Sequence, residues 1–329
     1  MRWKARLRVA IAALLVLNLG AACGGTVARP RAATTGASGV VPRPLNVQDP
    51  AEVPSAGPAP TCVPRASLRP AGPLPRPGHM PGGTAMARIV QRGQLVVGID
   101  QNAYLFSFRD PATGNLVGFE IDIARAIAGA LLGDPNAIKF RAITTADRIP
   151  VIERGEVDMV VRTMTMTCER WRQVAFSTEY LTSRQRLLVR IGSGIREFAD
   201  LAGRKVFATR GSTSIRTIAA QPSRPIPVST DSTLDCLVLL QQGQVDAVST
   251  IDVLMVGLAA QDPTTEIVGA PVSDEPSGVG ISRESPDLVR FVNGVLEGIR
   301  ADGTWARIYQ RWLSRLGPTP PAPAPVYQD

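Results

Sequence analysis

Residues 160–170 read Val-Val-Arg-Thr-Met-Thr-Met-Thr-Cys-Glu-Arg and join a hydrophobic run to a short charged segment. The run at 157–161 predicts a buried strand. Thr167 is a natural N-cap, so a helix is expected to begin after it. Free N–H groups at that helix start, threonine hydroxyls and the guanidinium of Arg170 together suit a carboxylate. The alternative is a capped helix with a solvated arginine, and this stretch alone does not separate the two.

A second stretch of similar design lies at 209–214, which reads Thr-Arg-Gly-Ser-Thr-Ser. It follows a predicted strand and opens a predicted helix, so it is another hydroxyl-rich helix start suited to an anion. The segments 155–160 (Gly-Glu-Val-Asp-Met-Val) and 243–248 (Gly-Gln-Val-Asp-Ala-Val) also match. We interpret the two halves as similarly built lobes with loops facing a shared cleft. A chance likeness between two ordinary αβ units is the alternative.

Strands and helices alternate from residue 84 to residue 317, which predicts mainly parallel sheets covered by helices. In such sheets ligands bind outside the carboxyl ends of the strands, where Asp100, residues 145–148 and residues 163–170 fall. The last two helices are expected to return to the first lobe. The predicted strands are 94–99, 116–119, 138–143, 157–161, 186–191, 205–208 and 279–282; the helices are 86–92, 121–132, 147–154, 232–241, 286–301 and 304–316.

Charge and histidine content exclude several function classes. The net charge is +8, but residues 84–317 hold 26 Lys+Arg against 25 Asp+Glu, so this region has no basic face built for nucleic acid. The only histidine, His79, lies in a Pro-rich segment. We therefore expect no His-based catalysis, no His metal site and no cofactor.

The first 22 residues have the pattern of a secretory signal. Four basic residues precede the hydrophobic run 9–19, which is too short to span a membrane. Gly20-Ala21-Ala22 then leads to Cys23, which resembles a lipobox with Gly20 where Leu is usual. We expect cleavage before Cys23 and its lipidation. The alternative is an ordinary secretory signal with an incidental cysteine.

Two Pro-rich segments flank the predicted fold. Residues 24–83 contain 13 of the 28 prolines, so 23–83 is expected to be a disordered linker between membrane and domain. The predicted organisation is lobe 1 at 84–186, lobe 2 at 187–275, a return to lobe 1 at 276–317 and a Pro-rich tail at 318–329.

Several motifs in order resemble the bacterial extracellular solute-binding proteins of family 3, and most closely the actinobacterial glutamate/glutamine-binding lipoproteins. No single motif is decisive, but the order and spacing are specific. The resemblance implies a periplasmic binding protein-like II fold, with two α/β lobes joined by two crossing strands. The motifs are Leu95–Asp100, Phe106–Phe108, Gly118–Ala124, Asp147–Pro150, Thr163–Arg170, Gly211–Ser214, Gly303–Trp305 and Ile308–Tyr309.

The resemblance also implies roles for individual residues. Arg170 would hold the α-carboxylate of an amino acid. Thr163, Thr165, Arg210, Ser212 and Thr213 would complete this cradle. Thr145 and Arg148 would meet an acidic side chain, Asp100 would meet polar side-chain atoms, and Tyr104 either covers the ligand or is an ordinary packed aromatic.

One position departs from the family. An Asp that pairs with the α-ammonium is usual where this chain has Ile251, with Asp252 next. Either Asp252 substitutes after a small loop shift, or Asp100 holds the ammonium, or the site no longer binds standard amino acids tightly. A buried ammonium without a partner would cost several kcal/mol.

The cysteines fit an exported protein. With Cys23 lipidated, three remain. Related lipoproteins imply a Cys62–Cys168 bridge and a free, buried Cys236. The alternative is three unpaired thiols.

The resemblance implies a binding protein, not an enzyme. It would be a monomer anchored to the outer face of the cell membrane by Cys23, and would pass glutamate, glutamine, aspartate or asparagine to the permease of an ABC importer. A sensor that reports ligand occupancy to a membrane receptor is a second hypothesis. A cyclohexadienyl dehydratase-like enzyme is a third, made less favourable by the absence of histidine from residues 84–317.

Overall fold

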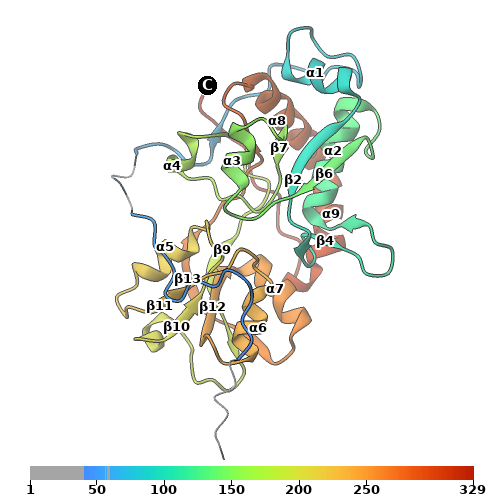
Figure 1. The fold of residues 1–329 in the computed structure, drawn as a ribbon. Coiled ribbons are helices and arrows are strands. Elements are labelled where there is room, and N and C mark those ends of the chain that lie inside the picture. The colour runs from blue at the N-terminus through green and yellow to red at the C-terminus, as the bar shows by residue number, and fades with distance from the viewer. Residues whose placement is uncertain (1–40, 56, 58–59) are drawn as a thin grey trace, which may run out of the picture. The chain divides into compact units, whose positions relative to one another are not determined.

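Two five-stranded sheets with helices on both faces form two lobes in the computed structural model, which describes residues 41–55, 57 and 60–329 (Figure 1). The expected signal segment and Cys23 lie outside the described residues. Among the described helices, none is long and apolar enough to cross a membrane.

Lobe 1 is built on a sheet of order β6-β2-β7-β14-β8. Strand β2 runs parallel to β6 and β7, whereas β14 runs antiparallel to β7 and β8. Because side chains alternate along a strand, Val97 and Ile99 face one core and Val96 faces another. The strands are β2 Leu95–Ile99, β6 Ile138–Ala142, β7 Met159–Val160, β8 Ala175–Phe176 and β14 Gly280–Ile281, with a small sheet of β3 Asn102–Ala103, β4 Ser107–Arg109 and β5 Leu116–Val117.

Helices cover both faces of this sheet. One face of the sheet forms the larger hydrophobic core with four helices: α1 Ala85–Arg92, α2 Phe119–Leu132, α8 Pro286–Ala301 and α9 Thr304–Leu313. A 3-10 turn, Ser314–Leu316, follows α9. The other face carries α3 Arg148–Glu153 and α4 Cys168–Trp171. The last two helices therefore return to lobe 1, as expected.

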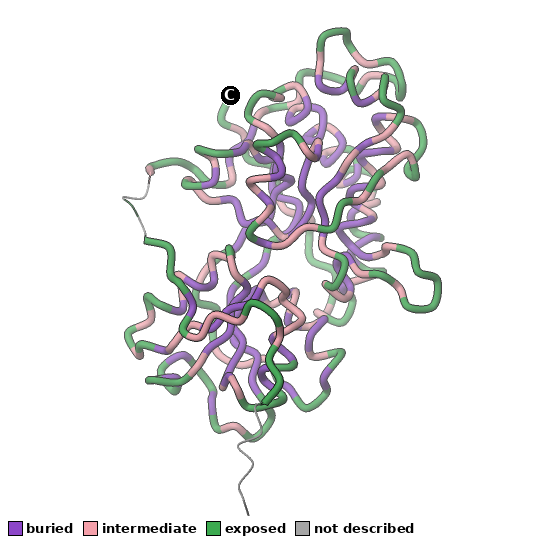
Figure 2. The backbone as a smooth tube through the Cα atoms, in the orientation of Figure 1, coloured by how far each residue is buried: buried purple, intermediate pink, exposed green. Residues whose placement is uncertain are grey.

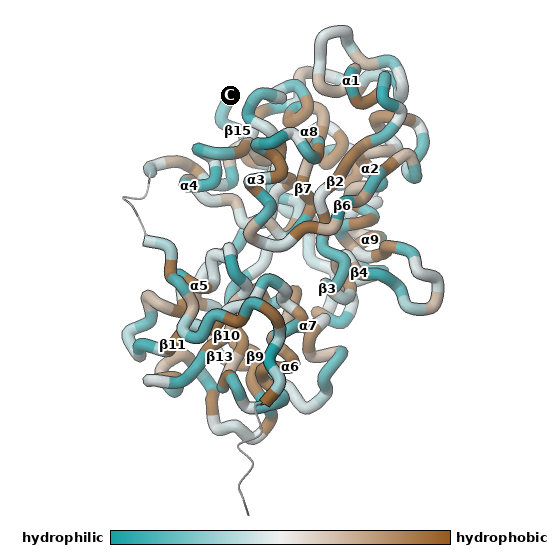
Figure 3. Tube along the Cα trace, in the orientation of Figure 1, coloured by the Kyte–Doolittle hydropathy of each residue, from teal (hydrophilic) through white to brown (hydrophobic). Residues whose placement is uncertain are grey.

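Lobe 2 repeats this design with a sheet of order β11-β10-β12-β9-β13. Strand β10 runs parallel to both β11 and β12, as β2 does to its neighbours. The strands are β9 Arg184–Arg190, β10 Lys205–Phe207, β11 Ile226–Val228, β12 Ala247–Ile251 and β13 Thr265–Asp274; the helices are the 3-10 helix Phe198–Leu201, α5 Ser214–Ala219, α6 Asp235–Gln241 and α7 Asp252–Gln261. The central strands β7, β14 and β12 are buried along their length (Figure 2), and hydrophobic residues follow them (Figure 3).

Two antiparallel strands, β9 and β13, connect the lobes. Beyond them, Ser277 forms bridges with Leu181 and with Thr165 of lobe 1. This arrangement confirms the expected fold of two α/β lobes joined by two crossing strands.

The expectation of a disordered linker is wrong for the described part of residues 41–83, named here the N-terminal arm. Gln48 pairs with Ser229 of lobe 2, and β1 (Ala66–Ser67) pairs in parallel with β15 (Val326–Tyr327) of the C-terminal tail. Asn293 of α8 donates to Ser67 Oγ at 2.8 Å. The arm has too few hydrophobic residues to form a core of its own. It is ordered because its backbone and side chains form hydrogen bonds with the folded lobes and the C-terminal tail.

Candidate functional site

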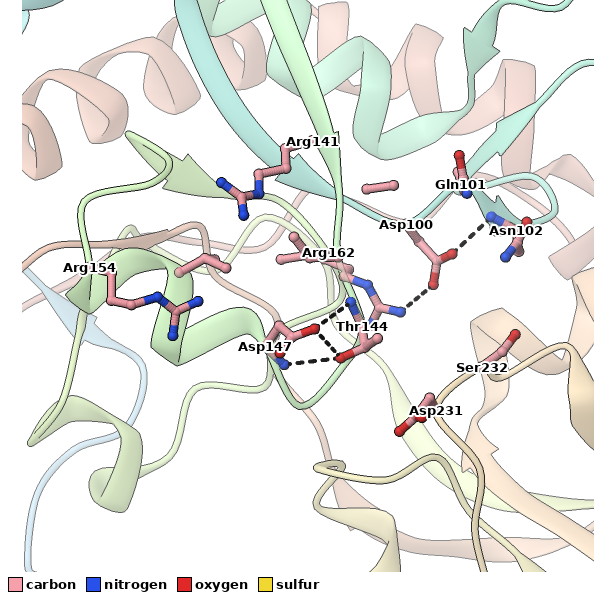
Figure 4. A pocket seen from close by; sticks show the side chains of 13 residues that line it. Asp100, Gln101, Asn102, Arg141, Thr144, Asp147, Arg154, Arg162, Asp231 and Ser232 are labelled. Carbon is pink, nitrogen blue, oxygen red and sulfur yellow. Dashed lines mark hydrogen bonds and ion pairs between the residues drawn. The ribbon is translucent and has the colours of Figure 1, made fainter. Parts of the chain in front are cut away.

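The loops at the carboxyl ends of β2, β6 and β7 meet the loops after β10 and β12 of lobe 2. They enclose an inner cavity of about 40 Å³. An outer cavity of about 400 Å³ shares Asp100 and Arg162 with it and reaches Asp231 of lobe 2 (Figure 4). The inner cavity is lined by Asp100, Ala103, Glu120, Thr145, Arg148, Arg162, Thr163, Thr165, Thr209, Ser212, Thr213, Ser214, Thr233, Thr250, Ile251 and Leu254.

Arg148 and Arg170 are buried and bond only to backbone carbonyls. Arg148 donates to the carbonyls of Thr145 (2.9 Å), Arg162 (3.3 Å), Thr163 (3.1 Å) and Gly211 (3.2 Å). Arg170 donates to those of Thr165 (2.9 Å) and Gly211 (3.2 Å). Neither guanidinium forms an ion pair with a carboxylate of the described residues. Burial lowers the pKa of both groups, that of Arg170 to about 10, so each stands to gain from an anionic partner.

A third buried guanidinium, Arg162, is already paired. Its Nη2 lies 2.6 Å from Asp100 Oδ2 (Figure 4). Its Nη1 donates to Thr145 Oγ1 at 2.5 Å. Its buried Nε has no hydrogen-bond partner in the part of the chain that the structure describes. Sequence reasoning did not assign Arg162 a role, although its place directly after a buried strand was a usable signal. The pair neutralises this part of the cavity wall.

Glu120 forms hydrogen bonds that stabilise the threonine-rich loop at residues 163–170. Its Oε1 accepts from the Thr163 N–H and from Tyr180 Oη, both at 2.5 Å. Thr163 has a φ of 39°, a left-handed conformation that is unfavourable for a β-branched residue. Burial raises the pKa of the Glu120 carboxyl, although the two bonds oppose that rise. Glu120 therefore holds the loop in a shape that Thr163 alone would not adopt.

The hydroxyls of Thr165 and Thr213 are joined by Glu275, which follows β13. Thr165 Oγ1 donates to Glu275 Oε2 at 2.7 Å and Thr213 Oγ1 at 2.8 Å. A hydroxyl has one hydrogen, so these two have none left for a ligand in this arrangement. Ser212 Oγ is buried without a hydrogen-bond partner among the described residues, so its hydrogen is available. Glu275 was not predicted from the sequence.

Gly211 is a point of close approach between the lobes. Its φ is 77°, and a Cβ there would lie 2.7 Å from the Ala146 Cα of lobe 1. Its carbonyl accepts from both Arg148 and Arg170. Only glycine combines this backbone conformation with this contact.

Seven of the predicted site residues line the inner cavity, but Arg170, Arg210, Tyr104 and Asp252 do not. Arg170 donates to the carbonyl of Thr165, which is a lining residue, and to that of Gly211. Arg210 pairs at 2.8 Å with Asp231, a residue of the outer cavity. Tyr104 packs edge-on against Phe108, with ring centroids 4.8 Å apart. Asp252 accepts from the backbone N–H groups of Arg184 (3.1 Å) and Val253 (2.8 Å). These bonds at the start of α7 turn its carboxylate away, so it does not substitute at the Ile251 position.

The cysteine prediction is confirmed. Cys62 and Cys168 form a disulfide, and Cys236 is free and buried. Burial raises the pKa of the Cys236 thiol. In the described part of the chain, no cluster of three or more His, Cys, Asp or Glu residues is placed to hold a metal ion.

Comparison with known proteins assigns the family. The model of the bacterial extracellular solute-binding proteins, family 3, matches residues 95–315. The chain belongs to this family. The family 3 match starts at β2, so the N-terminal arm precedes it.

Relatives of this family 3 protein include the ABC transporter glutamine-binding protein GlnH of Bacillus subtilis, 33% identical over 69% of this chain and 84% of that one. The glutamine-binding protein of Geobacillus stearothermophilus is 36% identical over 64% of this chain and 80% of that one. Among solved structures, holo ArgBP from T. maritima has a TM-score of 0.62 and 30% identity, and covers 70% of this chain and 100% of its own.

Proposed function

We propose that this family 3 protein captures an amino acid with an acidic side chain, glutamate first, between its lobes. The observation that carries the proposal is the pair of buried guanidiniums, Arg148 and Arg170, that bond only to carbonyls. Glu275 and Glu120 act on these charges from nearby but do not pair with them. A buried charge without a paired counter-charge is unfavourable, so an anionic ligand is favoured. A ligand with two carboxylates offers one to each arginine. Glutamine and asparagine offer only one.

The names of the relatives support an amino acid as ligand. Those that are 33% and 36% identical are named as glutamine-binding proteins. A relative from Escherichia coli, 28% identical over 73% of this chain and 82% of that one, is named as a glutamate/aspartate import solute-binding protein. These names describe binding proteins rather than enzymes. They also support an ABC permease as the partner.

Asp100 is our proposed partner for the α-ammonium. Ile251, Leu254 and Ala103 make the wall of the cavity apolar where the family usually has an acid. Asp252 is bonded elsewhere. Asp100 lines both cavities, and its side chain stays 13% exposed beside Arg162. It is thus placed to accept from an ammonium as well as from the guanidinium.

The cellular setting of the proposal comes from the N-terminal sequence. Cleavage before Cys23 and lipidation would hold a monomer on the outer face of the cell membrane, next to the permease. The sensor alternative uses the same ligand site and differs only in the membrane partner. Co-purification of the lipidated chain with a permease or with a receptor separates the two.

The test is calorimetric titration of the ligand-free protein with glutamate, glutamine, aspartate, asparagine and glutarate. Tight glutamate binding that is lost in Arg170→Ala supports the proposal. Binding of none of these compounds overturns it. If glutarate binds as tightly as glutamate, the α-ammonium is not recognised and the proposed role of Asp100 is wrong.

An Ile251→Asp variant sharpens the same experiment. It restores an acid in the apolar wall, so we expect glutamate to bind more tightly and glutarate more weakly. The matched control is Ile251→Asn, which is similar in size and uncharged. Equal gains in both variants would show that polarity, and not charge, limits binding.

A further inference from the structure

Glu275 is a buried carboxylate to which the proposed binding mode gives no role. It directly follows β13, one of the two crossing strands, and is 3% exposed. It is not among the residues that line the inner cavity. Within the described residues it forms no ion pair with an Arg or Lys. A buried carboxylate without such a pair depends on hydrogen-bond donors.

The donors to Glu275 come from both lobes. Its Oε2 accepts from Thr165 Oγ1 of lobe 1 at 2.7 Å and from Thr213 Oγ1 of lobe 2 at 2.8 Å. Its Oε1 accepts from Ser273 Oγ at 2.8 Å. Hydrogen bonds to an ionised acceptor are stronger than those between neutral groups. The loops that carry the two threonines therefore cannot separate without breaking one of these stronger bonds.

The backbone holds Glu275 on the lobe 1 side of the crossing. Its N–H donates to the Ser183 carbonyl at 2.8 Å, and Ser183 Oγ donates to the Glu275 carbonyl at 2.7 Å. Ser183 directly precedes β9, so the two crossing segments are bonded to each other here. The Met166 N–H of lobe 1 donates to the Pro276 carbonyl at 2.8 Å. Thr213 is therefore the partner that opening of the cleft would remove.

A second contact joins the same two regions at a more exposed position. Glu169 of α4 pairs with Arg216 of α5 at 2.5 Å. The Glu169 side chain is 50% exposed, and ion pairs as exposed as this contribute little to stability. We therefore expect the buried bonds to Glu275 to have the larger effect.

We propose that Glu275 is a positioning residue for lobe closure: its carboxylate holds one hydroxyl of each lobe and so favours the closed cleft before a ligand binds. In an open cleft Thr213 and Glu275 would bond to water instead, so closure gains the difference between the two sets of bonds. The proposal concerns lobe motion without ligand and does not depend on which ligand binds.

The experiment removes the hydroxyl of lobe 2 and measures lobe separation without ligand. Spin labels at Lys139→Cys and Glu266→Cys, both exposed and one in each lobe, report the distance distribution in the full chain. Thr213→Val should raise the ratio of open to closed protein about tenfold, the effect of losing one hydrogen bond to a charged group. The control is Thr217→Val, whose hydroxyl donates to the Thr213 carbonyl at 3.4 Å and not to Glu275. An equal rise in the control would show general loosening of α5 and overturn the proposal.

Glu275→Gln tests the carboxylate itself. The amide oxygen still accepts a hydrogen bond but carries no charge, so we expect a rise of only a few-fold in the open form. Combined with Thr213→Val it should add little, because both substitutions change the same bond. Distance distributions unchanged in both single variants, or effects that add fully in the double variant, overturn the proposal.

Arg216→Ala compares the exposed contact with the buried one. We expect a smaller shift than in Thr213→Val. A larger shift would assign closure to the ion pair and contradict the role of Glu275. If the distributions shift as expected but no amino acid binds, the proposed function is wrong and the role of Glu275 is still supported.

Discussion

The two loops of the anion site have similar sequences but contribute different chemistry. The loop of lobe 1, residues 163–170, ends in Arg170, which lies in α4 and is buried. The loop of lobe 2, residues 209–214, has its arginine before the glycine, and Arg210 pairs with Asp231 of the outer cavity. Lobe 2 instead supplies the Gly211 carbonyl and the Ser212 hydroxyl. The proposed function therefore places charge recognition on lobe 1, whereas lobe 2 contributes a backbone that approaches lobe 1 closely at Gly211.

The largest expected effect tests whether lobe 1 carries the charge recognition. Arg170→Ala should weaken glutamate binding at least about 100-fold, because it removes a buried charge-assisted pair of bonds worth about 3 kcal/mol. Calorimetry measures this loss. The control is Arg172→Ala, two residues further on and exposed. A loss of equal size in the control would mean that binding depends on the general charge of α4.

The next effect separates the two arginines of lobe 1. Arg148→Met should weaken glutamate binding by about 30-fold and glutamine binding by only a few-fold, because only glutamate brings a second carboxylate to the site. Competition between the two amino acids measures the ratio directly. Arg154→Met is the control, since Arg154 is exposed and pairs with Glu156. Equal losses for both amino acids would remove Arg148 from side-chain recognition.

A smaller effect tests the role of lobe 2. Gly211→Ala should weaken binding by about tenfold with a modest loss of stability, because the new Cβ meets Ala146 of lobe 1 when the cleft is closed. Gly194→Ala is a close control, with the same φ of 77° and open space around it. Titration and thermal unfolding of both variants separate backbone strain from lobe contact. Similar affinities in the two variants would show that the approach at Gly211 is not needed.

The smallest effect concerns the core of lobe 2, away from the site. Cys236 is fully buried, and burial raises the pKa of its thiol, so the native protein should not react with an aromatic disulfide reagent near pH 8. One thiol should react after unfolding without reductant if Cys23 is lipidated, and two in a chain that retains an unmodified Cys23. Rapid reaction of Cys236 in the native state would show that this core opens easily.

Periodicity and helix capping were sufficient to predict much of the fold. The helix expected at 286–301 is present with those bounds, and Thr167 accepts from the Arg170 N–H as an N-cap. These features depend on neighbours a few residues apart, which a single sequence displays. The arm was mistaken for a linker because composition reports whether a segment can form its own core. Composition does not report whether the segment can bond to another core, as Gln48 and Ser67 do.

The sequence by itself determined the α/β class and the two similar halves, and it predicted a ligand site at the strand ends. Only the tertiary structure decided which polar groups face the cavity. Asp252 and Arg210 bond locally, whereas Arg162, Glu120 and Glu275 become part of the site. The physical reason is that a buried polar group takes the partners that packing brings within about 3 Å, and those partners lie up to 110 residues away in the chain.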